Sequence, residues 1–232
     1  MKITISVMAW ILMGMVITSD LSAQVNAIAF SQIDVFQSDN QNIKTGKRPR
    51  AVFFGNSITE GFVKAVPDFF EINHYIGRGI SGQTTSQGLL RFRKDVLELN
   101  PEVVLINLGI NDIAENTGPY DEGFTLGHLI SMVELAKANN IKVVLASVLP
   151  ASNIYWRPSV ENTADKVISL NQSIKMMADQ YGLIYLDYHT ALKNSENGLD
   201  KELAEDGVHP TLKCYKIMAT LAEEAIQKTI NP

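Results

Sequence analysis

The chain has 232 residues, of which 46% are hydrophobic and 19% are charged, and its formal net charge at pH 7 is −5. This length and apolar content are enough to bury the core of one globular domain. The acidic balance, with no run of Lys or Arg, argues against a nucleic-acid partner. The chain has one cysteine, Cys214, which excludes an internal disulfide and a zinc site built on thiolates.

The first residues are typical of an export signal. Lys2 precedes the almost wholly apolar stretch 3–17, and small and polar residues follow as far as Ala23. This order predicts a signal peptide over residues 1–23, cleaved after Ala23. An uncleaved membrane anchor is the less favoured alternative, because a spanning helix needs about 20 apolar residues. We therefore expect an exported protein, periplasmic or extracellular, with no stable membrane insertion after cleavage.

Residues 24–50 are polar with scattered apolar positions, and they predict a short helix or extended arm that packs on the domain. From residue 51 to 232, strand-like and helix-like segments alternate. Short apolar runs predict strands over 51–54, 72–76, 103–108, 142–148 and 183–186. Helical spacing of apolar residues predicts helices over 82–99, 124–138, 160–181 and 211–228. This alternation predicts a three-layer α/β/α sandwich with about five parallel strands.

Four segments with polar and glycine residues follow strands or precede the last helix: 55–57, 77–82, 109–112 and 206–210. In an open parallel sheet, the loops after the strands meet at one edge, where ligands bind. Ser57 follows a buried strand directly, so it is a candidate nucleophile. The alternative is that Asn56 or Ser57 serves only as a helix N-cap, a position that both residue types favour.

The chemistry that fits these segments is acyl transfer. A serine hydroxyl is a weak nucleophile and needs a base, which His209 can provide, while Asp206 can hold the other ring nitrogen. The N–H groups of Ser57 and Gly79 and the side-chain amide of Asn111 could stabilise the oxyanion. The alternative for Asp206 and His209 is a capping residue followed by a surface histidine. The other histidines have no comparable partner and are interpreted as structural or surface residues.

Residues 77–82 also match the glycine pattern of a dinucleotide-binding loop, with Glu98 and Glu102 near the spacing of a ribose-binding acid. Two observations count against a nucleotide role. The loop follows the second predicted strand rather than the first, and the chain is predicted to be exported, where nicotinamide cofactors are scarce. A glycine that lets the backbone approach a substrate explains the loop equally well.

In this order, the four segments resemble the blocks of the SGNH (GDSL-type) hydrolase family of esterases and lipases. The resemblance covers nearly all of the chain after the predicted signal. It implies a flavodoxin-like sandwich with a shallow, exposed site and with neither metal nor cofactor. The functional residues it implies are Ser57 as nucleophile, Gly79 and Asn111 in the oxyanion hole, and Asp206 and His209 in the triad. The family usually has Asp before the serine, where this chain has Asn56, a change expected to alter loop hydrogen bonding but to leave activity in place.

The resemblance does not fix the substrate. We expect removal of O-acetyl groups from carbohydrate, because no long apolar lid segment is evident and the predicted strand-to-helix loop 151–158 carries Trp156 and Arg157. An aromatic ring and a guanidinium suit a sugar face, although Trp156 could equally serve only to pack the loop. The alternatives are a lysophospholipase or thioesterase of the same family, and a non-catalytic glycan-binding module. The expected partner is a small ester or an acetylated glycan.

Overall fold

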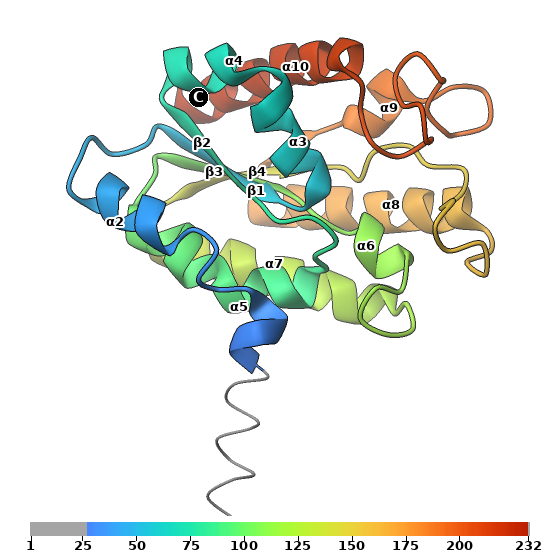
Figure 1. Cartoon of the computed structure of the whole chain (residues 1–232), viewed down its shortest axis with the longest axis horizontal. Helices are drawn as coiled ribbons and strands as arrows, with labels where there is room; N and C mark the ends of the chain where they lie inside the picture. The colour runs from blue at the N-terminus through green and yellow to red at the C-terminus, as the bar shows by residue number, and fades with distance from the viewer. Residues whose placement is uncertain (1–26, 232) are drawn as a thin grey trace, which may run out of the picture.

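The computed structural model describes residues 27–231. These residues form one five-stranded sheet between two layers of helices (Figure 1). The strands are β1 (Ala51–Gly55), β2 (Tyr75–Gly79), β3 (Val103–Asn107), β4 (Lys142–Ala146) and β5 (Ile184–Leu186). All neighbouring strands are parallel, in the order β2-β1-β3-β4-β5. The predicted α/β/α sandwich is confirmed, whereas the predicted signal peptide lies outside the described residues.

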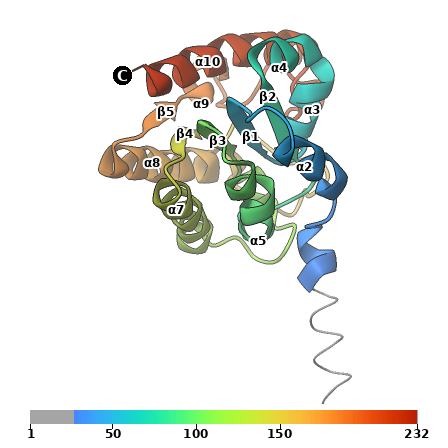
Figure 2. The same cartoon turned by 90° about the vertical axis from the view of Figure 1, so that its left-hand side faces the viewer.

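Helices cover both faces of the sheet. The longer ones are α3 (Ser57–Ala65), α5 (Thr85–Asp95), α7 (Glu122–Ala138), α8 (Thr163–Tyr181) and α10 (Leu212–Ile230). Short ones are α2 (Gln37–Lys44), α4 (Pro67–Asn73), α6 (Ile110–Ile113), α9 (Tyr188–Leu192) and a 3₁₀ turn at Leu97–Leu99. Figures 1 and 2 show α3, α4 and α10 on one face of the sheet and α5, α7 and α8 on the other.

The topology determines where the site lies. Every residue of β1 and β3 is buried, as expected for parallel strands covered on both faces. The chain runs outward from β1 to β2 on one side and from β1 to β3 on the other. The order of strands therefore reverses between β1 and β3, and the loops that follow these two strands open a crevice there.

The prediction of a strand over 72–76 is wrong by about three residues. Pro67 occupies the first turn of α4, a position proline favours, and the helix continues to Asn73. Ile72 therefore lies on an exposed helix face, with 77% of its surface accessible. His74 ends the helix in the left-handed conformation, and β2 begins only at Tyr75.

The helix predictions also need correction. The helix expected over 82–99 begins at Thr85, because Thr84 and Gln87 form a capping box, and it ends at Asp95 before the 3₁₀ turn. Helix α9 has five residues and was not predicted, since one turn and a half leaves too short an apolar pattern to detect.

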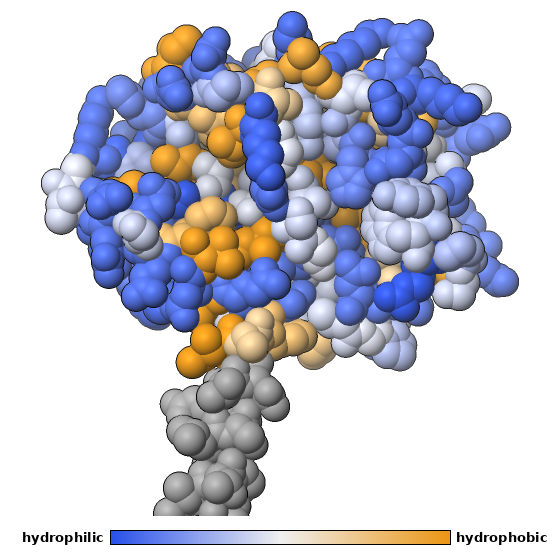
Figure 3. Space-filling model, viewed as in Figure 1, coloured by the Kyte–Doolittle hydropathy of each residue, from blue (hydrophilic) through white to orange (hydrophobic). Residues whose placement is uncertain are grey.

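Residues ahead of β1 pack on the domain. Helix α2 lies against the end of β2, where Asp39 and Asn40 bond to the side chain of Arg78. The first described residues, 27–31, are helical and leave Ile28 and Phe30 about half exposed. Figure 3 shows a mostly hydrophilic face, with apolar surface near the start of the described chain and further apolar patches elsewhere on the same face. Among the described helices, none is both long and apolar enough to span a bilayer.

Candidate active site

The turn between β1 and α3 presents Ser57. The strand ends at Gly55, Asn56 is the N-cap, and Ser57 is the first residue of the helix. The cap hydrogen bond is made by Asn56, whose Oδ1 accepts the N–H of Ile58 at 3.0 Å. Gly55 is needed for close packing, because a Cβ there would lie 2.7 Å from the carbonyl oxygen of Asn107. Capping therefore falls to Asn56 and leaves the Ser57 hydroxyl for another partner.

That partner is His209. The Oγ of Ser57 lies 2.9 Å from Nε2 of His209, and Nδ1 of the same ring lies 2.7 Å from Oδ2 of Asp206. The second carboxylate oxygen, Oδ1, accepts the N–H groups of Val208 and His209 at 2.9 and 2.7 Å. Asp206 thus shapes the turn and holds the imidazole at the same time. The three predicted residues form one hydrogen-bonded chain.

The electrostatics of this chain favour an ionised Asp206. Partial burial would raise the pKa of its carboxyl group, but the hydrogen bonds from His209 and Val208 outweigh burial and lower the pKa below its ordinary value. The Asp206 and His209 side chains remain 29% and 38% exposed. The site is therefore open to solvent, and a substrate reaches it without entering a deep cavity.

Residues 109–112, which follow β3, bring the side-chain amide of Asn111 to the same edge of the sheet as Ser57. Asn111 lies in α6, just after β3, and its buried Nδ2 donates to the carbonyl oxygen of Gln83 at 3.0 Å. Gly109 precedes it with φ +131°, a conformation that L side chains rarely adopt. The bond to Gln83 fixes the amide plane beside residues 80–83, the loop after β2. The amide of Asn111 is thus held against the loop after β2, and its role as an oxyanion donor stays a prediction.

The geometry of the loop after β2 favours Gly82 over Gly79 as the backbone donor. A Cβ on Gly79 would lie 2.3 Å from the nitrogen of Glu60 and 2.6 Å from the carbonyl oxygen of Asn56, so this glycine is required for packing against α3. Gly82 is exposed with φ +77° and immediately precedes Gln83. Within residues 27–231, its N–H has no hydrogen-bond partner. We propose that this free N–H, rather than that of Gly79, is the donor.

The predicted glycine pattern at 77–82 has a structural explanation of the same kind. A Cβ on Gly77 would lie 2.2 Å from a methyl carbon of Val63 in α3. Together with Gly79, it allows β2 to approach α3 closely. The sequence pattern could not separate these packing glycines from Gly82, since all three lie in one six-residue stretch. What distinguishes Gly82 is its positive φ, a property of the backbone that the sequence does not show.

Asp112 links the third segment to the start of α5. Its carboxylate accepts the N–H of Thr85 at 3.0 and 3.1 Å and the Thr85 hydroxyl at 2.5 Å. Burial raises the pKa of Asp112 to about 6, despite these hydrogen bonds. Nδ1 of His128 lies 3.1 Å from the same hydroxyl, which gives this histidine a structural role consistent with its interpretation from sequence. Asp112, the residue after Asn111, therefore braces the loop after β3 against the start of α5.

A family model described as GDSL-like lipase/acylhydrolase matches residues 53–217. The chain belongs to this family. A GDSL-like lipase from Bacteroides thetaiotaomicron is 45% identical, with a TM-score of 0.82 over 86% of this chain and 98% of that one. The resemblance inferred from the four segments is thereby confirmed.

Two further relatives are acetylxylan esterases. One, from Xylanibacter ruminicola, is 26% identical over 77% of this chain and 43% of its own length, so this chain spans less than half of that relative. The other is a catalytic mutant of a Geobacillus stearothermophilus enzyme, 20% identical with a TM-score of 0.62 over 78% of this chain and 95% of that one. At that identity, the likeness shows the fold alone.

In this GDSL-like chain, loop 151–158 reaches the catalytic histidine candidate. The Trp156 ring lies 5.7 Å from the ring of His209, at an interplanar angle of 32°. Tyr155 packs edge-on against Trp156 and is 57% exposed. Trp156 is also half-buried against the core, so it both packs the loop and borders the site. For Arg157, the described residues provide no partner to the guanidinium, and its backbone closes two turns of the loop.

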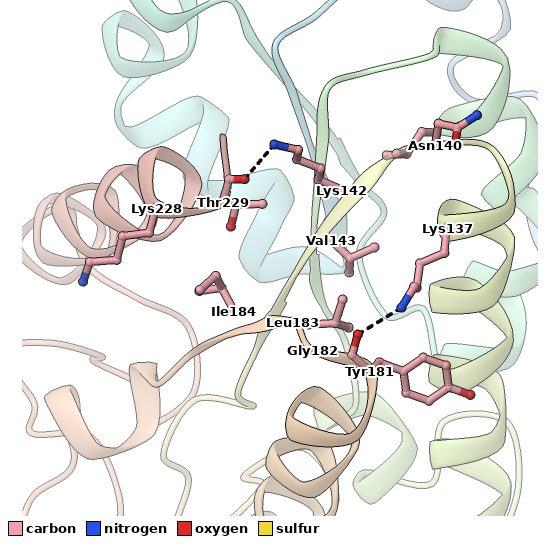
Figure 4. Close-up of a pocket in the computed structure, with 11 residues that line it drawn as sticks. Lys137, Asn140, Lys142, Val143, Tyr181, Gly182, Leu183, Ile184, Lys228 and Thr229 are labelled. Atoms are coloured by element: carbon pink, nitrogen blue, oxygen red, sulfur yellow. Dashed lines mark hydrogen bonds between the residues drawn. The ribbon is translucent and has the colours of Figure 1, made fainter. Parts of the chain in front are cut away.

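A cavity of about 480 Å³ lies at the other edge of the sheet. It is lined by residues at the amino ends of β4 and β5 and by the last turn of α10 (Figure 4). Two of its lysines are already engaged: Lys137 donates to the carbonyl oxygen of Tyr181, and Lys142 to those of Thr229 and Ile230. Because Ser57 lies at the carboxyl ends of the strands, this cavity is not part of the candidate site.

Proposed function

We propose that this chain is a serine ester hydrolase that works through an acyl-enzyme. The observation that carries the proposal is the hydrogen-bonded chain from Ser57 to His209 to Asp206. A binding module would need neither a base on the serine nor an acid to orient that base. The membership of the family agrees with this chemistry.

The reaction follows from the contacts. Ser57 Oγ attacks the ester carbonyl carbon while Nε2 of His209 takes the hydroxyl proton, and Asp206 stabilises the imidazolium that forms. The negative charge on the carbonyl oxygen is stabilised by the Asn111 amide and by the N–H groups of Ser57 and Gly82, of which Ser57 N–H lies in the first turn of α3 and lacks an intrahelical partner. The tetrahedral intermediate collapses as the alcohol leaves with the proton from His209. Water then attacks the acyl-enzyme by the same steps in reverse and releases the acid.

We propose O-acetyl groups on carbohydrate as the substrate. Support comes from the openness of the triad, from the Trp156 ring beside His209, and from the Arg157 guanidinium, which has no partner among residues 27–231. A flat sugar face suits an aromatic ring at the rim of a shallow site. The similarity to an acetylxylan esterase points in the same direction. With the signal predicted from sequence, we place this activity outside the cytoplasm.

The test compares the chain from residue 24 onward with its Ser57→Ala variant on p-nitrophenyl acetate, p-nitrophenyl butyrate and acetylated xylooligosaccharides. We expect turnover of the acetate ester and release of acetate from the oligosaccharide, both lost in the variant. Preference for longer acyl chains would favour the lysophospholipase or thioesterase alternative. Turnover that persists in the variant would remove Ser57 as the nucleophile, and binding of the glycan without turnover would favour a binding module.

A further inference from the structure

A buried arginine lies beneath the loops of the candidate site. Arg91, in α5, has 0% of its surface exposed, and all three of its guanidinium nitrogens are engaged. Nη2 donates to the carbonyl oxygen of Gly55 at 2.8 Å, and Nη1 donates to that of Arg78 at 3.1 Å. Nη1 also meets the carboxylate of Asp95 at 2.9 Å, while Nε donates to Oε1 of Gln83 at 2.5 Å. One side chain thus holds the loop after β1 and the loop after β2.

Gln83 connects Arg91 to the proposed oxyanion donors. Its side chain is fixed at both ends, since Nε2 donates to the carbonyl oxygen of Ser31 at 2.9 Å while Oε1 accepts from Arg91. Its backbone carbonyl accepts the Asn111 amide, and its backbone nitrogen follows Gly82 directly. A displacement of Gln83 would therefore shift both donors together.

The N-terminal arm completes the network. Asn40, buried in α2, accepts from Nε of Arg78 at 2.9 Å and donates to Oδ1 of Asp95 at 2.8 Å. Asp95 is in turn the carboxylate that pairs with Arg91. A buried charge pair of this kind is held in place only when its remaining hydrogen-bonding positions are satisfied. Here the arm supplies a hydrogen bond to Asp95 from the side chain of Asn40. It also supplies the carbonyl oxygen of Ser31, which accepts a hydrogen bond from the side chain of Gln83.

We propose that the segment 31–40 is a positioning element of the active site, which sets the oxyanion donors through Asn40, Arg91 and Gln83. The arm touches neither the triad nor the substrate in this account. Its effect on the reaction passes from Asn40 through the buried side chains of Asp95, Arg91 and Gln83 to Gly82 and Asn111. The inference rests on the proposed esterase function for its kinetic readout, and on the geometry above for everything else.

The first experiment measures kcat and KM for p-nitrophenyl acetate in Asn40→Leu and Gln83→Met, each well below its own Tm. We expect kcat to fall about 10- to 100-fold with KM within about twofold, since a small misplacement of oxyanion donors affects the transition state more than the bound ester. Inhibition by phenylboronic acid, whose tetrahedral adduct with a serine oxygen resembles the transition state, should weaken in proportion to kcat. The shape of the pH profile should not change, because the triad is untouched.

The matched control is Lys94→Ala. Lys94 also ties the arm to α5, through an exposed pair with Asp34, but it takes no part in the Arg91 network through its side chain. We expect kcat to stay within about twofold. Variants of Asn40 and Gln83 that lower Tm while keeping the wild-type kcat and boronate affinity would overturn the proposal and leave the network a purely structural role. If Asn40→Leu does not fold, the milder Asn40→Ala takes its place.

A second readout separates this proposal from the esterase proposal. In ¹⁵N-labelled protein, we expect Asn40→Leu to shift the backbone amide signal of Gly82 and the side-chain amide signal of Asn111, and Lys94→Ala to leave both unchanged. Unshifted signals would contradict the coupling even in an active enzyme. Shifted signals in a protein with no ester turnover would support the coupling while counting against the proposed function.

Discussion

Replacing Asp206 by Asn tests the arrangement of the triad most directly. Asn is nearly isosteric with Asp, and its Oδ1 can still accept the two backbone N–H groups of Val208 and His209 that the carboxylate accepts at 2.9 and 2.7 Å. The turn should therefore survive. The amide NH₂ would then point at Nδ1 of His209, in the place of the oxygen that lies 2.7 Å away. That ring nitrogen would have to accept, so the proton would move to Nε2.

A proton on Nε2 prevents the imidazole from taking the proton of Ser57. We expect kcat for p-nitrophenyl acetate to fall by about 10⁴, the loss typical of a wrong histidine tautomer in a serine triad, with little change in Tm. The control is Asp200→Asn, an exposed aspartate that accepts from Asn194 at 3.1 Å. A folded Asp206→Asn variant within tenfold of the wild-type kcat would refute the role of Asp206 in orienting His209.

Three further outcomes are expected. Gly79→Ala should lower the free energy of unfolding by about 1–3 kcal/mol in urea titrations, because its methyl would lie 2.3 Å from the nitrogen of Glu60; an unchanged value would refute the close packing. Trp156→Ala should raise KM for an acetylated xylooligosaccharide more than for p-nitrophenyl acetate, and equal effects would remove the sugar contact. Because burial raises the pKa of Asp112 from 3.8 to about 6, this group favours folding at pH 4, and its contribution is lost as the pH rises through about 6. Asp112→Asn should therefore flatten the dependence of the free energy of unfolding in urea on pH over that range. The same pH dependence in the variant and the wild type would contradict a raised pKa for Asp112.

The sequence predicts the strands well where both faces of the strand are buried under helices. Strands β1, β3 and β4 are continuous apolar runs because helices cover both faces of the sheet. Strand β2 contains two glycines and Arg78 and has no such run. Its glycines are required because a Cβ at either position would clash with atoms of α3 or of its N-cap residue. The side chain of Arg78 is buried, and it bonds to Asp39 and Asn40 of α2. These partners are remote in sequence, so the local pattern indicates a strand near residue 75 but not its bounds.

The same distinction applies to the candidate site. Ser57, Asp206 and His209 are predictable because their chemistry requires particular residue types at a strand end and before a helix. Gly82 could not be distinguished from Gly79 without the backbone conformation and the bond between Asn111 and Gln83. Residues such as Arg91 and Asn40 have no sequence signal at all. Their relation to the site exists only once α2, α5 and two strand ends are packed together.

Position 56 shows what the first loop requires. The family usually has Asp before the serine, and this chain has Asn56, which is 1% exposed and accepts the N–H of Ile58. An N-cap needs an acceptor oxygen, which Asn and Asp supply about equally well. A neutral amide at this depth needs no counter-charge, whereas a buried carboxylate would. It also adds no negative charge next to Ser57, where an oxyanion must be stabilised. The departure from the family pattern is therefore compatible with catalysis, because the loop depends on the oxygen of residue 56 rather than on its charge.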